Sequence, residues 1–291
     1  MRTIILGANG QLGSDLVKAF RAHSCDVAGL THQDVEVSDA AGLERYWENL
    51  KPDVVVNTAA FHNVELCESD PETALVVNAL APRRLAAASV KHGFRLIHVS
   101  TDYVFDGAKG RPYTEADAPR PLNCYGKSKL SGEYFVSAGA RDYAIVRVSG
   151  LYGAAPCRAK KGLNFVKTML KLARERGEVK VTADEFVTPT YTVAAANQIV
   201  KLAEAGLNGL FHATPQGQCS WYEFAKAIFR FTQTPVKLTR SNSADFPAKV
   251  ARPRYSVLDN TALREARLDI MPEWTQCLCD YLKELGEFKA E

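Results

Sequence analysis

The first half of the chain alternates short runs of β-branched and aliphatic residues with longer stretches that favour helices. This alternation constrains the fold strongly, because parallel strands need a crossover, usually a helix, between them. Strands rich in Val, Ile and Leu that alternate with helices are typical of a parallel sheet covered on both faces. The strands predicted here are 2–6, 25–30, 53–57, 95–100 and 143–148, and the helices are 12–24, 39–51, 71–92 and a segment that begins near Tyr125.

The alternation is less regular after residue 148, where a proline-bearing irregular segment also precedes the C-terminal helix. We therefore predict an α/β fold, a doubly wound parallel sheet of the Rossmann type with a smaller C-terminal α/β lobe. The elements predicted in this half are helices at 164–177, 192–205 and 220–231 and strands at 178–181 and 209–214.

Composition excludes several classes of function. The 291 residues carry a net charge of +3 with Lys and Arg scattered, so no basic stripe indicates a nucleic-acid partner. No segment approaches the roughly 20 apolar residues of a membrane helix, and the first residues lack the apolar core of a signal peptide. We expect a cytoplasmic protein without a membrane partner. Seven cysteines without Cys-x-x-Cys spacing and six dispersed histidines predict reduced thiols and no metal site.

The first predicted strand leads into GANGQLG, in which Gly7, Gly10 and Gly13 are three apart. Glycines allow a sharp turn and let a pyrophosphate approach the backbone without meeting a Cβ. The free amides at the start of the next helix then face the negative charge. Between a strand and a helix, this spacing predicts a dinucleotide site. The domains predicted are a dinucleotide-binding domain over 1–149 with elements from about 178–213, and a substrate-binding lobe over 150–177 and 214–291.

The end of the second predicted strand indicates which dinucleotide binds. A carboxylate there would hydrogen-bond the adenosine ribose of NAD and repel the 2′-phosphate of NADP. The sequence has Leu30, Thr31 and His32 before the first acid, Asp34. We therefore expect NADPH, with Thr31 and His32 near the phosphate. NADH is the alternative, since Asp34 could turn toward the ribose.

A tyrosine and a lysine four residues apart, Tyr125 and Lys129, lie in NCYGKSKLSGEYF and would share one face of a helix. The strand before them delivers Ser100, Thr101 and Asp102 to the carboxyl edge of the sheet, where doubly wound folds bind ligands. A lysine ammonium lowers the pKa of a neighbouring phenol, which can then protonate a carbonyl oxygen as hydride reaches the carbon. The sequence predicts that Tyr125 is this acid, assisted by Lys129 and Thr101.

Together these motifs resemble the extended, nucleotide-sugar branch of the short-chain dehydrogenase/reductase superfamily, and more narrowly the dTDP-4-dehydrorhamnose reductase family. The resemblance covers almost the whole chain, and its most specific segments are STDYVFDG, PLNCYGKSKLSGE and RPRYSVLDN in that order. It implies that NADPH reduces the 4-keto group of a dTDP-linked 6-deoxyhexose. The partner is then a nucleotide sugar, and the chain could also form a homodimer.

The resemblance also implies roles for individual residues. Thr101, Tyr125 and Lys129 form the catalytic set, and Thr101, Asp102 and Tyr125 lie against the sugar. The residues expected at the cofactor are Gly7, Gly10, Gln11, Leu12, Gly13, Thr31, His32, Glu36, Val37, Ala60, Phe61, His62, Val99, Tyr125 and Lys129.

Three further side chains have two interpretations each. Arg252 could clamp a substrate phosphate through a bidentate contact or form a surface ion pair. His62 either meets the cofactor or only packs in its loop. Asn78 either supports the active site or serves the helix structure alone. The apolar stripe that begins at Trp221 is expected to be core.

The sequence departs from the family pattern at two places. A tryptophan that packs on the substrate usually follows the fifth strand, where this chain has Gly150. The segment 154–162 is longer than expected, and its Arg158, Lys160 and Lys161 could contact a phosphate or form a solvated loop.

Two other functions are compatible with this fold. One is a different nucleotide-sugar enzyme, an epimerase or a 4-reductase for another sugar; a 4,6-dehydratase would need an Asp-Glu pair after Thr101, where the chain has Asp102 and Tyr103. The other is a regulatory subunit that binds a dinucleotide without turnover. The intact Thr101, Tyr125 and Lys129 favour an enzyme.

Overall fold

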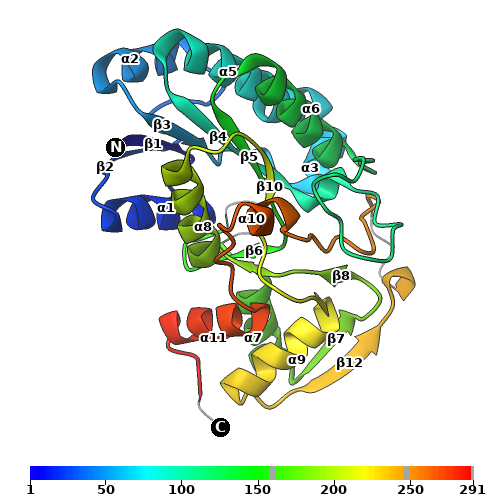
Figure 1. Cartoon of the computed structure of the whole chain (residues 1–291). Coiled ribbons are helices and arrows are strands. Elements are labelled where there is room, and N and C mark those ends of the chain that lie inside the picture. The colour runs from blue at the N-terminus through cyan, green and yellow to red at the C-terminus, as the bar shows by residue number, and fades with distance from the viewer. Residues whose placement is uncertain (158–161, 246–248, 290–291) are drawn as a thin grey trace.

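The protein is described by a computed structural model that covers residues 1–157, 162–245 and 249–289 (Figure 1). Its centre is a six-stranded sheet with the strand order β10-β5-β4-β3-β1-β2, in which every pairing is parallel. The predicted α/β fold with a doubly wound sheet is confirmed. The strands are β1 (Arg2–Leu6), β2 (Asp26–Leu30), β3 (Val54–Asn57), β4 (Arg95–Thr101), β5 (Tyr143–Val148) and β10 (Gly209–His212).

Helices cover both faces of this sheet (Figure 1). One face packs its aliphatic side chains against α1 and α8, and the other packs against α2, α5 and α6. Asp39 caps α2, because its side chain accepts a hydrogen bond from the Gly42 amide. The helices are α1 (Gln11–Ala22), α2 (Ala40–Leu50), α5 (Ala81–His92), α6 (Cys124–Gly139) and α8 (Thr192–Ala205).

The segment predicted as one helix over 71–92 contains a π-helical turn. It begins as α4 (Pro71–Leu75), with Asp70 as the N-cap and proline in the first turn, and passes through Val76–Leu80 into α5. A π turn inserts one residue into the helical ladder, a local change that is frequent at functional sites. Here the turn contains Asn78, whose side chain is completely buried. A short helix, α3 (Val64–Ser69), precedes α4.

A smaller α/β region lies beneath the sheet (Figure 1) and has its own aromatic and aliphatic core. The sequence predicted that elements from about 178–213 belong to the dinucleotide-binding domain. Of these elements, β10 is a strand of the large sheet and α8 packs on it, whereas β7 pairs with β12 in the smaller region. The division into two domains stays a prediction. The elements of the remaining chain are β6 (Leu151–Tyr152), α7 (Phe165–Arg176), β7 (Glu178–Thr182), β8 (Phe186–Val187), β9 (Thr190–Tyr191), β11 (Cys219–Ser220), α9 (Trp221–Thr232), β12 (Lys237–Ser241), α10 (Thr261–Glu265) and α11 (Trp274–Glu284).

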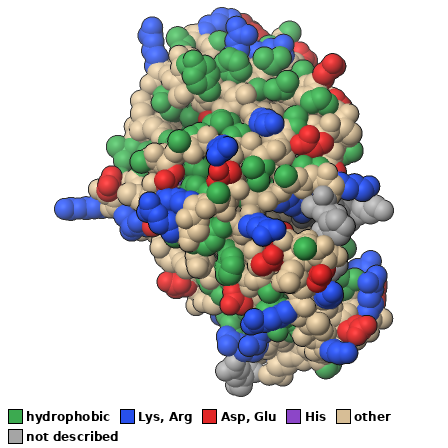
Figure 2. Space-filling view, turned by 90° about the vertical axis from the view of Figure 1, so that its right-hand side faces the viewer, with side chains coloured by type: hydrophobic (Ala, Val, Ile, Leu, Met, Phe, Trp, Pro, Cys, Tyr) green, Lys and Arg blue, Asp and Glu red, His purple; other side chains and the backbone are tan. Residues whose placement is uncertain are grey.

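The surface carries charges of both signs. On the face in Figure 2, Lys and Arg side chains are interspersed with Asp and Glu. Within the described residues, no helix is both long enough and apolar enough to cross a bilayer. All seven cysteines lie in the described part and are free thiols.

Candidate active site

The glycine turn is shaped by close backbone contacts. Gly7 has φ +81°, and a Cβ there would lie 2.8 Å from Thr58 Oγ1. A Cβ on Gly13 would lie 2.2 Å from the Gly7 carbonyl oxygen, so only glycine lets α1 start this close to β1. Gly10 is the N-cap of α1 and supplies no side-chain hydrogen bond to the first helical amides. The turn thus provides a tight cradle with polar backbone groups and no side chain in the way, which fits the pyrophosphate of a dinucleotide.

The acid after β2 is engaged within its own turn. The Asp34 carboxylate accepts hydrogen bonds from the backbone amide of Thr31 at 2.8 Å and from its hydroxyl at 2.7 Å. These two bonds hold the pKa of Asp34 below its ordinary value. Val37 is buried in the core between the sheet and α2. The roles predicted for Thr31, His32, Glu36 and Val37 at the adenosine end stay predictions.

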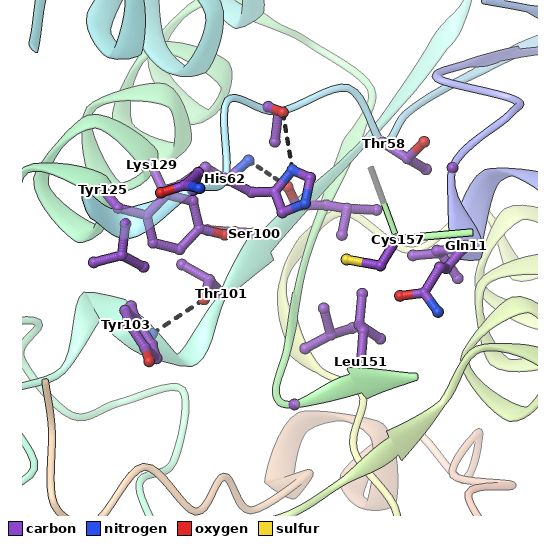
Figure 3. Close-up of a pocket in the computed structure, with 18 of the residues that line it drawn as sticks. Gln11, Thr58, His62, Ser100, Thr101, Tyr103, Tyr125, Lys129, Leu151 and Cys157 are labelled. Carbon is purple, nitrogen blue, oxygen red and sulfur yellow. Dashed lines mark hydrogen bonds between the residues drawn. The ribbon is translucent and has the colours of Figure 1, made fainter. Parts of the chain in front are cut away.

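A cavity of about 590 Å³ opens at the carboxyl edge of the sheet (Figure 3). Twelve of the residues predicted for the site line it together, whereas Gly7, Thr31, His32, Glu36, Val37 and Phe61 are not among the described residues of its wall. The predicted residues in the wall are Gly10, Gln11, Leu12, Gly13, Ala60, His62, Val99, Thr101, Asp102, Tyr125, Lys129 and Arg252.

A second cavity of about 390 Å³ lies between this edge and the smaller region. Trp221 and Phe224 contribute to its wall. The prediction that their stripe is core is confirmed for Phe224, which is 1% exposed, but Trp221 is half-buried and faces the cavity. The two cavities share the wall residues Gln11, Asp102, Tyr103, Gly150, Leu151, Cys157 and Arg252.

The start of α6 brings Tyr125 to the end of β4. Asn123 caps the helix by accepting a hydrogen bond from the Gly126 amide at 2.8 Å. Gly126 packs directly on the chain after β4, because a Cβ there would lie 2.2 Å from the Tyr103 carbonyl oxygen. The Tyr125 ring meets the Tyr103 ring edge to face, with centroids 5.7 Å apart. Figure 3 shows Tyr125 beside Thr101, with Gln11 and Cys157 across the cavity.

Protonation of the predicted acid is governed by burial. Burial raises the pKa of the Tyr125 phenol above its ordinary value, with a smaller opposing effect from a hydrogen bond to Thr101. The predicted direction, a pKa lowered by Lys129, is therefore wrong for this structure. The physical reason is that burial of the phenol dominates, while Lys129 Nζ donates to the Val99 carbonyl oxygen at 2.7 Å and lies 3.4 Å from His98 Nε2.

Thr101 and Asp102 form a buried network at the floor of the cavity. Thr101 Oγ1 donates to Asp102 Oδ1 at 3.0 Å, and Ser149 Oγ donates to Asp102 Oδ2 at 2.9 Å. Asp102 is 4% exposed, and burial raises the pKa of its carboxyl. The Tyr103 amide donates to Thr101 Oγ1 at 3.2 Å, which fixes the threonine rotamer. The network holds Thr101 in place beside Tyr125.

Asn78 joins the cofactor side of the cavity to the catalytic helix. Its amide nitrogen donates to the Phe61 carbonyl oxygen at 2.9 Å and to Ser128 Oγ at 3.1 Å. Its amide oxygen accepts from the Phe61 amide at 2.9 Å. These contacts favour a supporting role for Asn78 at the site, since Ala60 and His62 on either side of Phe61 line the cavity.

Arg252 and Gly150 belong to the wall that the two cavities share. Arg252 forms an ion pair with Glu65 and lines both cavities. Gly150 has φ +53°, and a Cβ there would meet the Val187 side chain at 3.2 Å. Arg158, Lys160 and Lys161 lie outside the described residues.

Several wall residues were not predicted from the sequence, among them Tyr103, Glu65 and Cys157. Tyr103 follows Asp102 directly, so its place after β4 was a usable signal. Glu65 lies in the first turn of α3 and Cys157 in the irregular segment after β6, and neither belongs to a motif of fixed spacing. The described residues hold no group of three or more His, Cys, Asp or Glu arranged for a metal ion, and the expectation that no metal is needed stays a prediction.

Comparison with known proteins gives consistent matches. The family described as RmlD substrate binding domain matches residues 1–287. A dTDP-4-keto-6-deoxy-D-glucose reductase from Streptomyces niveus is 37% identical, covering 95% of each chain. The crystal structure of a dTDP-4-dehydrorhamnose reductase from Clostridium acetobutylicum superposes with a TM-score of 0.93 at 40% identity, covering 98% of this chain and all of that one. A dTDP-4-dehydrorhamnose reductase from Bacillus anthracis, solved in complex with NADP, gives 0.92 at 37% identity, covering 97% and 99%.

Proposed function

Because the chain belongs to the RmlD substrate-binding domain family, we propose that it uses NADPH to reduce the 4-keto group of a nucleotide-linked 6-deoxyhexose. The proposed substrate is dTDP-4-dehydro-L-rhamnose and the product dTDP-L-rhamnose. The observation that carries the proposal is the single cavity in which Thr101, Tyr125 and Lys129 share a wall with the glycine turn. NADP in the B. anthracis relative supports the choice of NADPH, and NADH is the alternative.

The glycine turn fits the dinucleotide, since α1 begins at Gln11 and its first amides have no partner within the helix, while the absence of a Cβ on Gly13 lets the helix start against the Gly7 carbonyl oxygen. When bound, NADPH supplies the hydride that reaches C4 of the sugar. Val99, Ala60 and His62 line the wall between the turn and the catalytic residues, where the rest of the cofactor would lie.

Tyr125 is proposed to donate its phenolic proton to the C4 oxygen. A phenol whose pKa is raised by burial is fully protonated at neutral pH, which suits a proton donor. Thr101 would hydrogen-bond the same oxygen by turning its hydroxyl proton away from Asp102 Oδ1, and the position of Oγ1 is already held by the Tyr103 amide. The neighbouring cavity, with Arg252 at its mouth, would take the nucleotide diphosphate.

A second reading concerns the sugar. The S. niveus relative is a reductase of dTDP-4-keto-6-deoxy-D-glucose, so a 4-reductase with another sugar specificity remains the leading alternative. Gly150 supports this alternative. It lies in the wall shared by the two cavities and has no side chain to pack on the substrate, whereas the family usually has a tryptophan there. Epimerase activity and a regulatory role without turnover are weaker alternatives. The cytoplasmic location and the homodimer stay predictions.

The test is cofactor oxidation followed at 340 nm. The purified chain is mixed with NADPH or NADH and with dTDP-4-dehydro-L-rhamnose or dTDP-4-keto-6-deoxy-D-glucose in separate reactions. We expect the highest kcat/KM with NADPH and dTDP-4-dehydro-L-rhamnose, with dTDP-L-rhamnose as product. Turnover of the other sugar alone would reassign the substrate, and tight NADPH binding without any turnover would support the regulatory reading.

A further inference from the structure

The amine of Lys129 lies in an unusual hydrogen-bonding environment. The side chain is 2% exposed, and the hydrogen bonds of the described residues give Nζ one carbonyl acceptor, Val99 at 2.7 Å. Its other polar neighbour is the imidazole Nε2 of His98, at 3.4 Å. An ammonium group has three N–H donors and no lone pair. Whether this second contact is favourable therefore depends on which nitrogen of His98 carries the proton.

Asn57 at the end of β3 decides that question. Its amide oxygen accepts a hydrogen bond from the Ala59 amide at 3.1 Å, so its amide nitrogen is the atom that faces His98. That nitrogen lies 3.2 Å from His98 Nδ1 and can only donate. Nδ1 must then accept with its lone pair. A neutral imidazole carries one proton, which is left on Nε2, the nitrogen that faces Lys129.

An Nε2–H group cannot donate to an ammonium, but it can donate to the lone pair of a neutral amine. We propose that Asn57 and His98 form a hydrogen-bond chain that presents an imidazole N–H to Lys129 and so favours the uncharged form of this lysine. The chain runs from the Ala59 amide through Asn57 and His98 to Nζ, with one donor and one acceptor at every step. If Lys129 were protonated, its ammonium and the His98 Nε2–H group would both be donors and would face each other without an acceptor.

The surroundings are consistent with this arrangement. His98 is 1% exposed, and burial lowers its pKa well below the ordinary value, so the imidazole stays neutral. Burial also lowers the pKa of Lys129, to about 8.

The other ionisable groups near the amine come from three elements. Glu133 on α6 acts in the opposite direction and raises the pKa of Lys129, but its carboxylate is paired with Arg147 of β5. Tyr125 on α6 and Asp102 after β4 also line the cavity, and burial raises the pKa of both, which favours their neutral forms. Within the described residues, none of these groups accepts a second hydrogen bond from Nζ. His98 is thus a positioning residue that acts through Lys129.

The assignment of the His98 tautomer depends on geometry alone, whereas its role during turnover rests on the proposed function. After Tyr125 gives its proton to the C4 oxygen, a phenolate remains that must be reprotonated. Because its Nζ is held at Val99 and His98, Lys129 would give that proton through an intervening hydroxyl or water and become the neutral amine that His98 stabilises. Water then returns the proton, so each turnover consumes one proton with the hydride.

Nitrogen-15 NMR of the full-length chain tests the tautomer without any substrate. We expect His98 to show the Nε2–H pattern at pH 7, with the signal assigned by its loss in His98→Gln. His212 serves as an internal control with the opposite pattern, since its Nδ1 faces two carbonyl oxygens at 3.1 Å and its Nε2 faces Arg147. An Nδ1–H tautomer or an imidazolium at His98 would overturn the proposal, and neither outcome depends on activity.

A double-variant cycle tests the effect on Lys129. Asn57→Asp keeps the acceptor for the Ala59 amide but lets His98 Nδ1 donate, so Nε2 becomes an acceptor for the ammonium. Followed by the carbon-13 shift of the lysine Cε, the pKa of Lys129 should rise by more than one unit in Asn57→Asp. In a His98→Leu background, where only the added charge acts, the rise should be less than half as large. Equal rises in both backgrounds would contradict the proposed chain.

Discussion

Both main-chain polar groups of Phe61 are paired with the side-chain amide of Asn78, each at 2.9 Å. This pairing ties the loop after β3 to the π-helical turn, and Ser128 extends it to the catalytic helix. Replacement by Ala should leave the Phe61 amide without its partner and the Phe61 carbonyl oxygen with the Cys67 thiol alone. We expect Asn78→Ala to lower the free energy of unfolding by about 2–3 kcal/mol and to raise the KM for NADPH more than it lowers kcat.

Urea denaturation and steady-state kinetics measure these effects. Leu75→Ala is the matched control, because Leu75 lies one turn away on the same helical segment and is 45% exposed. That control should change stability by no more than about 0.5 kcal/mol. An Asn78→Ala protein with unchanged stability and NADPH affinity would show that the pairing of Asn78 with Phe61 contributes to neither.

The catalytic helix is also held by a buried ion pair. Both carboxylate oxygens of Glu133 on α6 accept from Arg147 of β5, one from Nε at 2.9 Å and the other from Nη2 at 2.6 Å, and both side chains are almost fully buried. Ser100 donates to the same carboxylate. Glu133→Gln removes one charge and leaves the other buried, so we expect a loss of about 3–5 kcal/mol in the free energy of unfolding.

The surface pair between Lys171 and Glu175 provides the comparison, since its atoms are 3.8 Å apart and half-exposed. Glu175→Gln should cost at most about 0.5 kcal/mol in the same urea titration. Similar losses for the two variants would mean that the buried pair contributes no more than a surface pair does.

The stability of the fold should depend on pH through His212. Burial lowers the pKa of its imidazole to about 3 from an ordinary 6.5. The unfolded chain therefore binds a proton below pH 6.5 that the folded chain does not, and stability falls as the pH falls toward 3. At pH 5 this group alone should cost about 2 kcal/mol relative to pH 7.5.

His212→Gln isolates that contribution, because a glutamine can donate to the same carbonyl oxygens without titrating. The variant should lose about 2 kcal/mol less than the parent between pH 7.5 and pH 5 in urea titrations. Parallel pH profiles for the two proteins would contradict the assignment.

The sheet and much of the site could be predicted from the sequence because both depend on local signals. The glycine turn after β1 and the tyrosine helix after β4 are motifs of fixed spacing, and parallel topology brings the ends of their strands to one edge.

The features that were missed depend on contacts between distant segments. The pKa of Tyr125 was predicted in the wrong direction because the sequence does not show where the Lys129 amine points, and β4 provides its acceptor. The π-helical turn is invisible to helical periodicity, since its flanks are ordinary helix. The pairing of β7 with β12 arises from tertiary contact within the smaller region.

The most direct test of the account compares two tyrosines in the same cavity. Tyr125→Phe and Tyr103→Phe each remove one hydroxyl from rings 5.7 Å apart, so they are matched in size and place. Product formation from dTDP-4-dehydro-L-rhamnose and NADPH is measured by chromatography, and NADPH binding by fluorescence.

The account predicts that Tyr125→Phe lowers kcat by about 10²–10⁴-fold while NADPH still binds, and that Tyr103→Phe stays within about tenfold of the parent. A Tyr125→Phe enzyme that forms the product at a rate close to that of the parent would contradict the assignment of Tyr125 as the proton donor.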